Sequence, residues 1–247
     1  MKKLRPMLCF ATRCAKEILR DPLTLFFGLI FPLVLLLLMT LIQHNIPVNL
    51  FRPEQLTPGI AVFGLSFFAL FSAMLISRDR SSAFLLRLYS TPLRAVDFLL
   101  GYLLPLLPMA LLQGAIVYIV SLPLGLPFSS RFPAAWAVGM LPALLYIALG
   151  LLCGTLLNDK QVGGICGALL TNLSAWLSGV WFDISLLGGA FGAVCRALPF
   201  YHAVEACRDA LAGRPGVWAH ALVVLAYAAG LLALACVCFA RKMRKDS

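Results

Sequence analysis

The stretch LTLFFGLIFPLVLLLLMTLI, residues 23–42, runs for a full membrane thickness without a single Asp, Glu, Lys or Arg. A helix of about twenty apolar residues spans the roughly 30 Å hydrocarbon core of a bilayer. The whole chain has the same character, because 62% of its 247 residues are apolar and only 12% are charged. Soluble domains contain about 45–50% apolar and about 25% charged residues. This composition predicts an all-α integral membrane protein.

Five further charge-free runs follow the first one along the chain. They occupy residues 59–76, 98–121, 134–157, 162–182 and 217–239. Each is close to the length that one crossing requires. We therefore predict six transmembrane helices within a single transmembrane domain covering residues 1–247.

Basic residues are distributed unevenly between the connecting segments. Fifteen of the twenty Lys and Arg residues lie in residues 1–22, 77–97, 160 and 241–245, which fall on one side of the membrane if six runs cross. Cytoplasmic loops are the ones enriched in Lys and Arg. Both termini are therefore expected in the cytoplasm. The protein is expected to be a multi-pass protein of the cell membrane, namely the bacterial inner membrane. The net charge is +10, but the basic residues flank apolar runs and do not form one continuous stripe. Nucleic acid is therefore not an expected partner.

Residues 4–20 form an amphipathic pattern ahead of the first run. The charged residues lie elsewhere on the helix from the apolar ones. The apolar residues recur at helical spacing: Leu4, Met7, Leu8, Ala11, Cys14, Ala15, Ile18 and Leu19. The pattern predicts a helix in the membrane interface, with its apolar face toward lipid and its basic face toward anionic headgroups. Asp21-Pro22 ends it, because a residue before proline avoids helical geometry.

Residues 184–198 form an apolar segment that is short for a crossing. Gly188, Gly189 and Gly192 interrupt it before Pro199. If it crossed, the basic C-terminal tail would move to the outer side, against the charge asymmetry. We therefore predict a re-entrant hairpin between the fifth and sixth spans.

The segment SRDRSSAFLLRLYSTPL, residues 77–93, combines charged and apolar residues between two spans. A helix over residues 78–91 would gather Phe84, Leu85, Leu88 and Tyr89 on one arc, with Arg80 and Arg87 on the other side. Such a helix suits a groove on a partner protein. The alternative is a solvated loop with one helical turn on the headgroups.

Motifs that carry enzyme chemistry are absent from the sequence. It contains no phosphate-binding loop, GxSxG or HExxH motif, and no paired cysteine spacing typical of zinc sites or disulfides. We therefore expect a non-enzyme, with no cofactor and no metal. The spacing of His202 and Glu205 allows either a shared metal or a structural contact. Glu205 also lies three residues before Arg208, a spacing that lets the two pair, and Asp209 is close enough in sequence to join them.

Small and polar residues inside the runs carry further information. Gly150, Gly154, Gly163 and Gly167, together with Gly188 and Gly192, form GxxxG spacings that favour close packing of the fourth and fifth spans. Gln113 and Asn172 are the clear mid-span polar candidates. An ion-coupled transporter normally keeps ionisable groups in its spans, so the energy for transport is expected from elsewhere.

On these residues, the chain resembles the membrane-spanning permease of a type-2 (exporter) ATP-binding-cassette transporter over nearly its whole length. The loop after the second span matches the family pattern at Asp79, Arg80, Arg87, Leu88, Thr91 and Pro92, whereas Ala83, Phe84 and Leu86 replace the Gly-Thr pair and Glu of many members. The outer region matches in order at Ser178-Gly179, Pro199, Glu205 and Arg208.

The resemblance implies a division of labour between chains. Arg78, Asp79, Arg80, Phe84, Leu85, Arg87, Leu88, Tyr89, Thr91 and Pro92 would form a coupling helix docked on cytoplasmic ATPase subunits, which bind ATP and Mg²⁺. Ser178, Gly179, Gly188, Gly189, Pro199, Glu205 and Arg208 would form the outer gate. A second permease, identical or related, would complete the path for a lipophilic or amphipathic substrate. The alternatives are an autonomous secondary transporter or channel, and a non-transporting scaffold or intramembrane enzyme.

Overall fold

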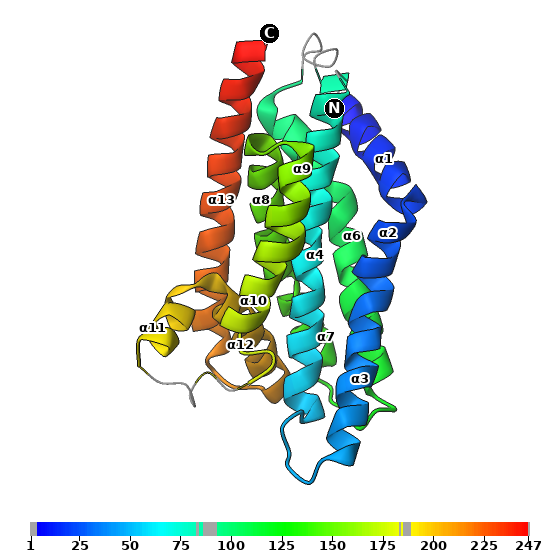
Figure 1. Ribbon diagram of the computed structural model, residues 1–247, viewed down its shortest axis with the longest axis vertical. Helices are drawn as coiled ribbons and strands as arrows, with labels where there is room; N and C mark the ends of the chain where they lie inside the picture. Colours follow the sequence, from blue (N-terminus) through cyan, green and yellow to red (C-terminus); the bar gives the residue numbers. More distant parts are fainter. Residues whose placement is uncertain (1–3, 83, 86–92, 183, 185–188, 247) are drawn as a thin grey trace.

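Helix α4, from Pro53 to Ser81, forms the centre of a helical bundle in a computed structural model that describes residues 4–82, 84–85, 93–182, 184 and 189–246 (Figure 1). Its most apolar window is 89% buried within the chain. Four helices pack around it: α3 (Phe31–Asn45), α6 (Ala95–Ser121), α8 (Met140–Leu156) and α12 (Pro199–Ala212). Phe68, Ile60 and Ile76 on α4 are fully buried, so this helix supplies much of the core.

The first predicted span is one helical column with a local π-helical stretch. It consists of α2 (Pro22–Leu25), η1 (Phe26–Ile30) and α3 (Phe31–Asn45). Pro32 lies in the first turn of α3, where its missing N–H interrupts the regular hydrogen-bond ladder. Asp21 caps the N-terminus of α2 by accepting from the Leu23 amide at 3.2 Å.

The middle of the chain supplies two more long helical columns. α6 runs from Ala95 to Ser121, and its N-terminus is capped by Asp97, which accepts from the Arg94 amide at 2.9 Å. α7 (Phe132–Val138) and α8 (Met140–Leu156) follow in line and are separated at Gly139. Helix α13, from Val217 to Asp246, closes the bundle against α8 and α12.

Five helical columns in the described part of the chain are long and apolar enough to cross a membrane: Pro22–Asn45, Pro53–Ser81, Ala95–Ser121, Phe132–Leu156 and Val217–Arg244. The predicted span 162–182 is not among them. That stretch contains α9 (Asp159–Val162), η2 (Gly163–Leu170) and α10 (Thr171–Leu177), which follow one another along α4 (Figure 1). The sixth crossing therefore stays a prediction.

The two termini lie at the same end of the bundle, which we call the N/C end (Figure 1). α4 ends and α6 begins there too. The opposite, far end holds α11 (Gly189–Ala197) and α12 (Pro199–Ala212), two short helices joined at Leu198. Helix α11 occupies most of the predicted re-entrant segment 184–198, and α12 comes directly after it. Re-entry of this segment into the membrane stays a prediction, as does the cytoplasmic placement of the termini.

Helix α1, from Leu4 to Arg20, is helical over the predicted range but does not offer its whole apolar face to lipid. Met7, Phe10, Cys14 and Ile18 are buried, and the Phe10 ring lies 4.8 Å from that of Tyr102 on α6. Leu19 is 66% exposed. The expectation of a purely lipid-facing surface is corrected here, because the neighbouring α6 offers an aromatic partner that headgroups do not.

The close packing predicted from the glycine spacings is made with α4 at Gly150 and Gly154. A Cβ at Gly154 would lie 2.6 Å from the Ala73 carbonyl oxygen, and one at Gly150 would overlap Ser72 and Ala69. These glycines therefore bring α8 onto α4, not onto the 162–182 stretch. Gly163 has no neighbour within 4 Å of a Cβ position, and Gly188 lies outside the described residues.

Candidate functional site

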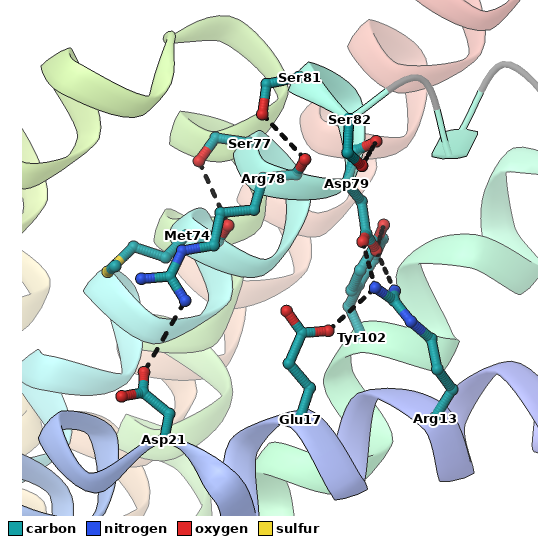
Figure 2. A network of polar contacts seen from close by, with 10 residues as sticks. All are labelled: Arg13, Glu17, Asp21, Met74, Ser77, Arg78, Asp79, Ser81, Ser82 and Tyr102. Carbon is teal, nitrogen blue, oxygen red and sulfur yellow. Dashed lines mark hydrogen bonds and ion pairs between the residues drawn. The ribbon is translucent and has the colours of Figure 1, made fainter.

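Asp79 lies in the last turns of α4, at the N/C end, at the centre of a polar network (Figure 2). Its side chain is only 2% exposed. The Arg13 guanidinium on α1 donates two hydrogen bonds to it, from Nη1 to Oδ2 at 2.5 Å and from Nη2 to Oδ1 at 2.6 Å. The Tyr102 hydroxyl on α6 donates to Oδ2 at 2.8 Å. One carboxylate thus connects three helices, in the paired geometry that a buried charge requires.

Arg13 itself is held in place by two further groups. Glu17, one turn further along α1, pairs with its Nη2 at 3.0 Å. The Phe84 ring lies 4.3 Å from the guanidinium carbon, in cation–π geometry. Burial raises the pKa of the Glu17 carboxyl above its ordinary value, and the charge of Arg13 opposes that rise.

Arg80 points to the other side of α4 and binds the end of α8. Its guanidinium donates to the carbonyl oxygens of Gly154, at 3.1 Å, and of Thr155 and Leu157. The last carbonyl groups of a helix have no partner within the helix and carry partial negative charge, so a cation there is stabilising. Ser77 adds a hydrogen bond to Asp159 at 2.9 Å, which joins α4 to α9.

Arg78 lies on the exposed side of the same turn. Its side chain is 43% exposed and reaches Asp21 at 3.9 Å (Figure 2). Between it and α1 is an open hollow of about 800 Å³ that also borders Lys16 and Arg20. The end of α4 therefore has two sides. Asp79 and Arg80 face the interior of the bundle, whereas Arg78 borders the open hollow together with Lys16 and Arg20.

These positions change the expected coupling helix. Residues 78–81 are the last turn of α4, so a separate helix does not begin at Arg78. Asp79 and Arg80 bond within the chain, Leu85 is only 1% exposed, and Phe84 is half-buried. A role of these four residues in docking an ATPase stays a prediction. Arg87, Leu88, Tyr89, Thr91 and Pro92 lie outside the described residues, as do Ala83 and Leu86.

At the far end, Arg208 on α12 connects three parts of the chain. Nη1 donates to Glu205 Oε1 at 2.8 Å, so the pairing expected from their spacing is confirmed. Nη2 donates to the Gly179 carbonyl oxygen at 3.0 Å and Nε to that of Gln55 at 3.2 Å. α12 is thereby joined to the end of α10 and the start of α4, beside a cavity of about 420 Å³.

The other outer residues occupy supporting positions. Gly179 has φ +73°, a left-handed conformation that favours glycine, and Ser178 before it is buried. Pro199 begins α12, and Gly189 begins α11 with φ +54°. Gly188 lies outside the described residues.

At the far end, two of the pairings that the spacing allows give way to other contacts. Asp209 does not join the Glu205–Arg208 pair, because it faces Arg214 at 3.5 Å and His220 at 3.9 Å. His202 contacts His220, with their Nδ1 atoms 2.7 Å apart, instead of sharing a site with Glu205. His220 lies on α13 and Arg214 just before it. These contacts exist because α13 packs against α12 in the tertiary structure.

The sequence did not single out Arg13 or Tyr102 as partners of Asp79. Arg13 is one of six basic residues before the first span, and Tyr102 is an aromatic residue within an apolar run. The mid-span candidates are less distinctive: Gln113 donates to the Ala61 carbonyl at 3.3 Å, and Asn172 to that of Ala168 at 2.8 Å. A buried acid is the informative signal, because it needs a cation nearby.

Comparison with known proteins identifies the family. A search of curated proteins found none that matches. The sequence model of the ABC-2 type transporter family, which describes the membrane domain, matches residues 8–212, from α1 through α12. Together with the apolar helices, the match shows that this multi-pass membrane protein belongs to the ABC-2 type transporter family as a permease domain and is not itself the ATPase.

Proposed function

We propose that the chain is the permease subunit of an ATP-driven exporter, moving a lipophilic or amphipathic substrate out of the cytoplasm. Separate ATP-binding-cassette ATPase subunits would bind ATP and Mg²⁺ and supply the energy. A second permease, identical or related, would complete the path, in a bacterial inner membrane. Family membership and the apolar helical columns support this proposal.

The observation that carries the proposal is the clamp on Asp79. The segment after Ser81 leaves α4 directly beside this carboxylate, which α1 and α6 hold through Arg13 and Tyr102. A force applied to the segment by a partner would therefore act on three helices together. Because α4 is the central helix of the bundle, its displacement would be passed to α8 and α12.

The far end supports an outer gate in the same scheme. Arg208 holds the start of α4, the end of α10 and α12 at one point. A movement of α4 would strain these bonds and open the 420 Å³ cavity beside them. The outer gate would comprise Ser178, Gly179, Gly188, Gly189, Pro199, Glu205 and Arg208.

Substitutions that place a negative charge in the segment after α4 test the docking role. We expect Arg87→Glu and Leu88→Asp each to abolish copurification of the ATPase, detected by mass spectrometry as a protein with a phosphate-binding loop. The prediction rests on the basic and apolar faces of the sequence at these positions. Membrane insertion should be unchanged, because neither residue belongs to an apolar run.

Arg241→Glu is the matched control, since Arg241 is exposed on α13 at the same N/C end. This variant should retain the ATPase. Copurification that persists in both test variants would count against docking at this segment. Transport by the chain alone in liposomes, driven only by an ion gradient, would overturn the export proposal itself.

A further inference from the structure

Two histidine rings face each other at the far end, across the contact between α12 and α13. His202 Nδ1 and His220 Nδ1 are 2.7 Å apart, and the ring centroids are 4.9 Å apart. Only one proton fits between two ring nitrogens at this distance, so at least one Nδ1 presents a lone pair to the other. Neither ring takes part in the Glu205–Arg208 pair.

The second nitrogen of each ring faces an oxygen acceptor. His202 Nε2 lies 2.9 Å from the Arg196 carbonyl oxygen, which requires a proton on Nε2 and leaves Nδ1 free in the neutral ring. His220 Nε2 lies 3.9 Å from Asp209 Oδ2. Metal-binding histidines commonly direct their second nitrogen to a backbone carbonyl or a carboxylate in this way, which fixes the tautomer and orients the ring.

With His202 Nδ1 as the acceptor, the proton between the two rings lies on His220 Nδ1. A metal ion takes its place when that proton moves to His220 Nε2, the nitrogen on the Asp209 side. Both rings are within reach of solvent. Burial lowers the pKa of His202, which favours the neutral imidazole at neutral pH. The His220 side chain is 22% exposed, and His202 is half-buried. Tyr201 stands beside both rings, with centroids 5.4 and 5.9 Å away.

We propose that His202 and His220 form a two-imidazole site for a divalent transition metal of the zinc class, joining α12 to α13. Imidazole nitrogen suits Zn²⁺, Cu²⁺ and Ni²⁺. At Zn–N distances of about 2.0–2.1 Å, two nitrogens of a tetrahedral site lie roughly 3.4 Å apart. The rings therefore separate by a fraction of an ångström to admit the ion, a change that side-chain rotation provides.

The other coordination positions are left to water or a small anion. Among the described residues, no group of three His, Cys, Asp or Glu side chains gathers to hold a metal. Asp209 lies outside the coordination sphere, with Oδ2 3.9 Å from His220 Nε2. With two protein ligands, the ion exchanges readily and acts as a clamp between two helices. This site is independent of the export function, and its test does not involve transport.

Metal binding to the full-length chain tests the site. The chain is purified in detergent through a tag without histidine, treated with EDTA, and titrated with ZnCl₂ by calorimetry. We expect one zinc ion per chain and a rise in Tm, because the ion binds the folded state. His202→Asn and His220→Asn should each weaken binding tenfold or more. His44→Asn, exposed at the end of α3, is the matched control and should bind like the wild type.

Acidification gives a second readout with a defined sign. Protonated imidazole cannot bind metal, so affinity should fall as the pH drops below the ordinary histidine pKa of about 6.5. Zinc should also protect His202 and His220 of the wild-type chain from diethyl pyrocarbonate, a measurement that does not depend on a variant folding. Absence of binding or protection, or equal zinc binding by all variants, as expected for a site on exposed Cys9, would overturn the proposal.

Discussion

At the scale of single residues, the Asp79 network shows how a charged side chain is kept inside an apolar bundle. A buried carboxylate is costly unless a cation and hydrogen-bond donors satisfy both oxygens. Arg13 and Tyr102 do so here. The two partners are unequal, because Arg13 is 38% exposed and Asp79 only 2%. Removing the Arg13 side chain should therefore change the stability of the protein by a different amount from removing the Asp79 side chain.

Removal of Arg13 is predicted to be more damaging than removal of Asp79. Arg13→Ala leaves the buried carboxylate with Tyr102 alone, an unsatisfied group that costs about 1–3 kcal/mol or more. In Asp79→Ala, the half-exposed Arg13 turns to water and keeps Glu17 as a partner, so the fall in Tm should be smaller. Thermal unfolding of the purified chain in detergent measures both.

The double variant Arg13→Ala/Asp79→Ala is the control for direct coupling. With both charges gone, its Tm should lie above that of Arg13→Ala, since no unpaired carboxylate remains. Equal losses in the two single variants, additive in a double-mutant cycle, would contradict a direct pair.

At the scale of elements, the close contact of α4 and α8 depends on two glycines. Gly150 and Gly154 lie one turn apart on α8 and face Ala69, Ser72 and Ala73 of α4. The approach brings the Ile147 carbonyl oxygen of α8 to 3.2 Å from Ser72 Oγ, whose shortest hydrogen bond, at 2.7 Å, goes to the Phe68 carbonyl oxygen of its own helix. Close packing of this kind replaces the hydrophobic effect as the cohesive force within lipid.

Alanine at Gly154 is predicted to lower the Tm, although alanine favours helices. Its Cβ would lie 2.6 Å from the Ala73 carbonyl oxygen, and backbone cannot move aside as a flexible side chain does. Overpacking of this type typically costs about 1–3 kcal/mol. The unfolding temperature in detergent reports the change.

Gly230→Ala on α13 is the matched control, because nothing lies within 4 Å of a Cβ there. That variant should be as stable as the wild type or more so. A Gly154→Ala protein with unchanged Tm would show that the helices adjust without cost.

At the scale of the whole molecule, the two ends of the bundle differ in their connections. Both termini, and the junction of α4 with α6, lie at the N/C end, whereas α11 and α12 lie at the far end (Figure 1). The N/C end carries most of the basic segments, which orientation rules assign to the cytoplasm.

Reporter fusions test that orientation. We expect green fluorescent protein fused after Ser247 to fluoresce, since it folds in the cytoplasm, and alkaline phosphatase at the same place to be inactive. Alkaline phosphatase inserted between Ser129 and Ser130, in the far-end connection before α7, should be active. The reverse pattern would place the termini outside and contradict the charge-based assignment.

The sequence by itself determined the all-helical membrane class, five of the spans, the amphipathic α1 and the Glu205–Arg208 pair. Each depends on composition or on spacing within one helix, where periodicity and length suffice. The orientation, the sixth crossing and the docking segment stay predictions. They depend on the membrane or on a partner chain.

Only the tertiary structure decided that Asp79 pairs with Arg13, that Arg80 binds the end of α8, that Leu85 faces inward and that His202 meets His220. Helical periodicity fixes which residues share a face, but it does not say which other helix that face meets. Arg13 and Asp79 are 66 residues apart in the chain, and their contact exists because α1 folds back along α6. Packing between helices thus made Asp79, at the start of the segment expected to bind a partner, the point where three helices of this chain are joined.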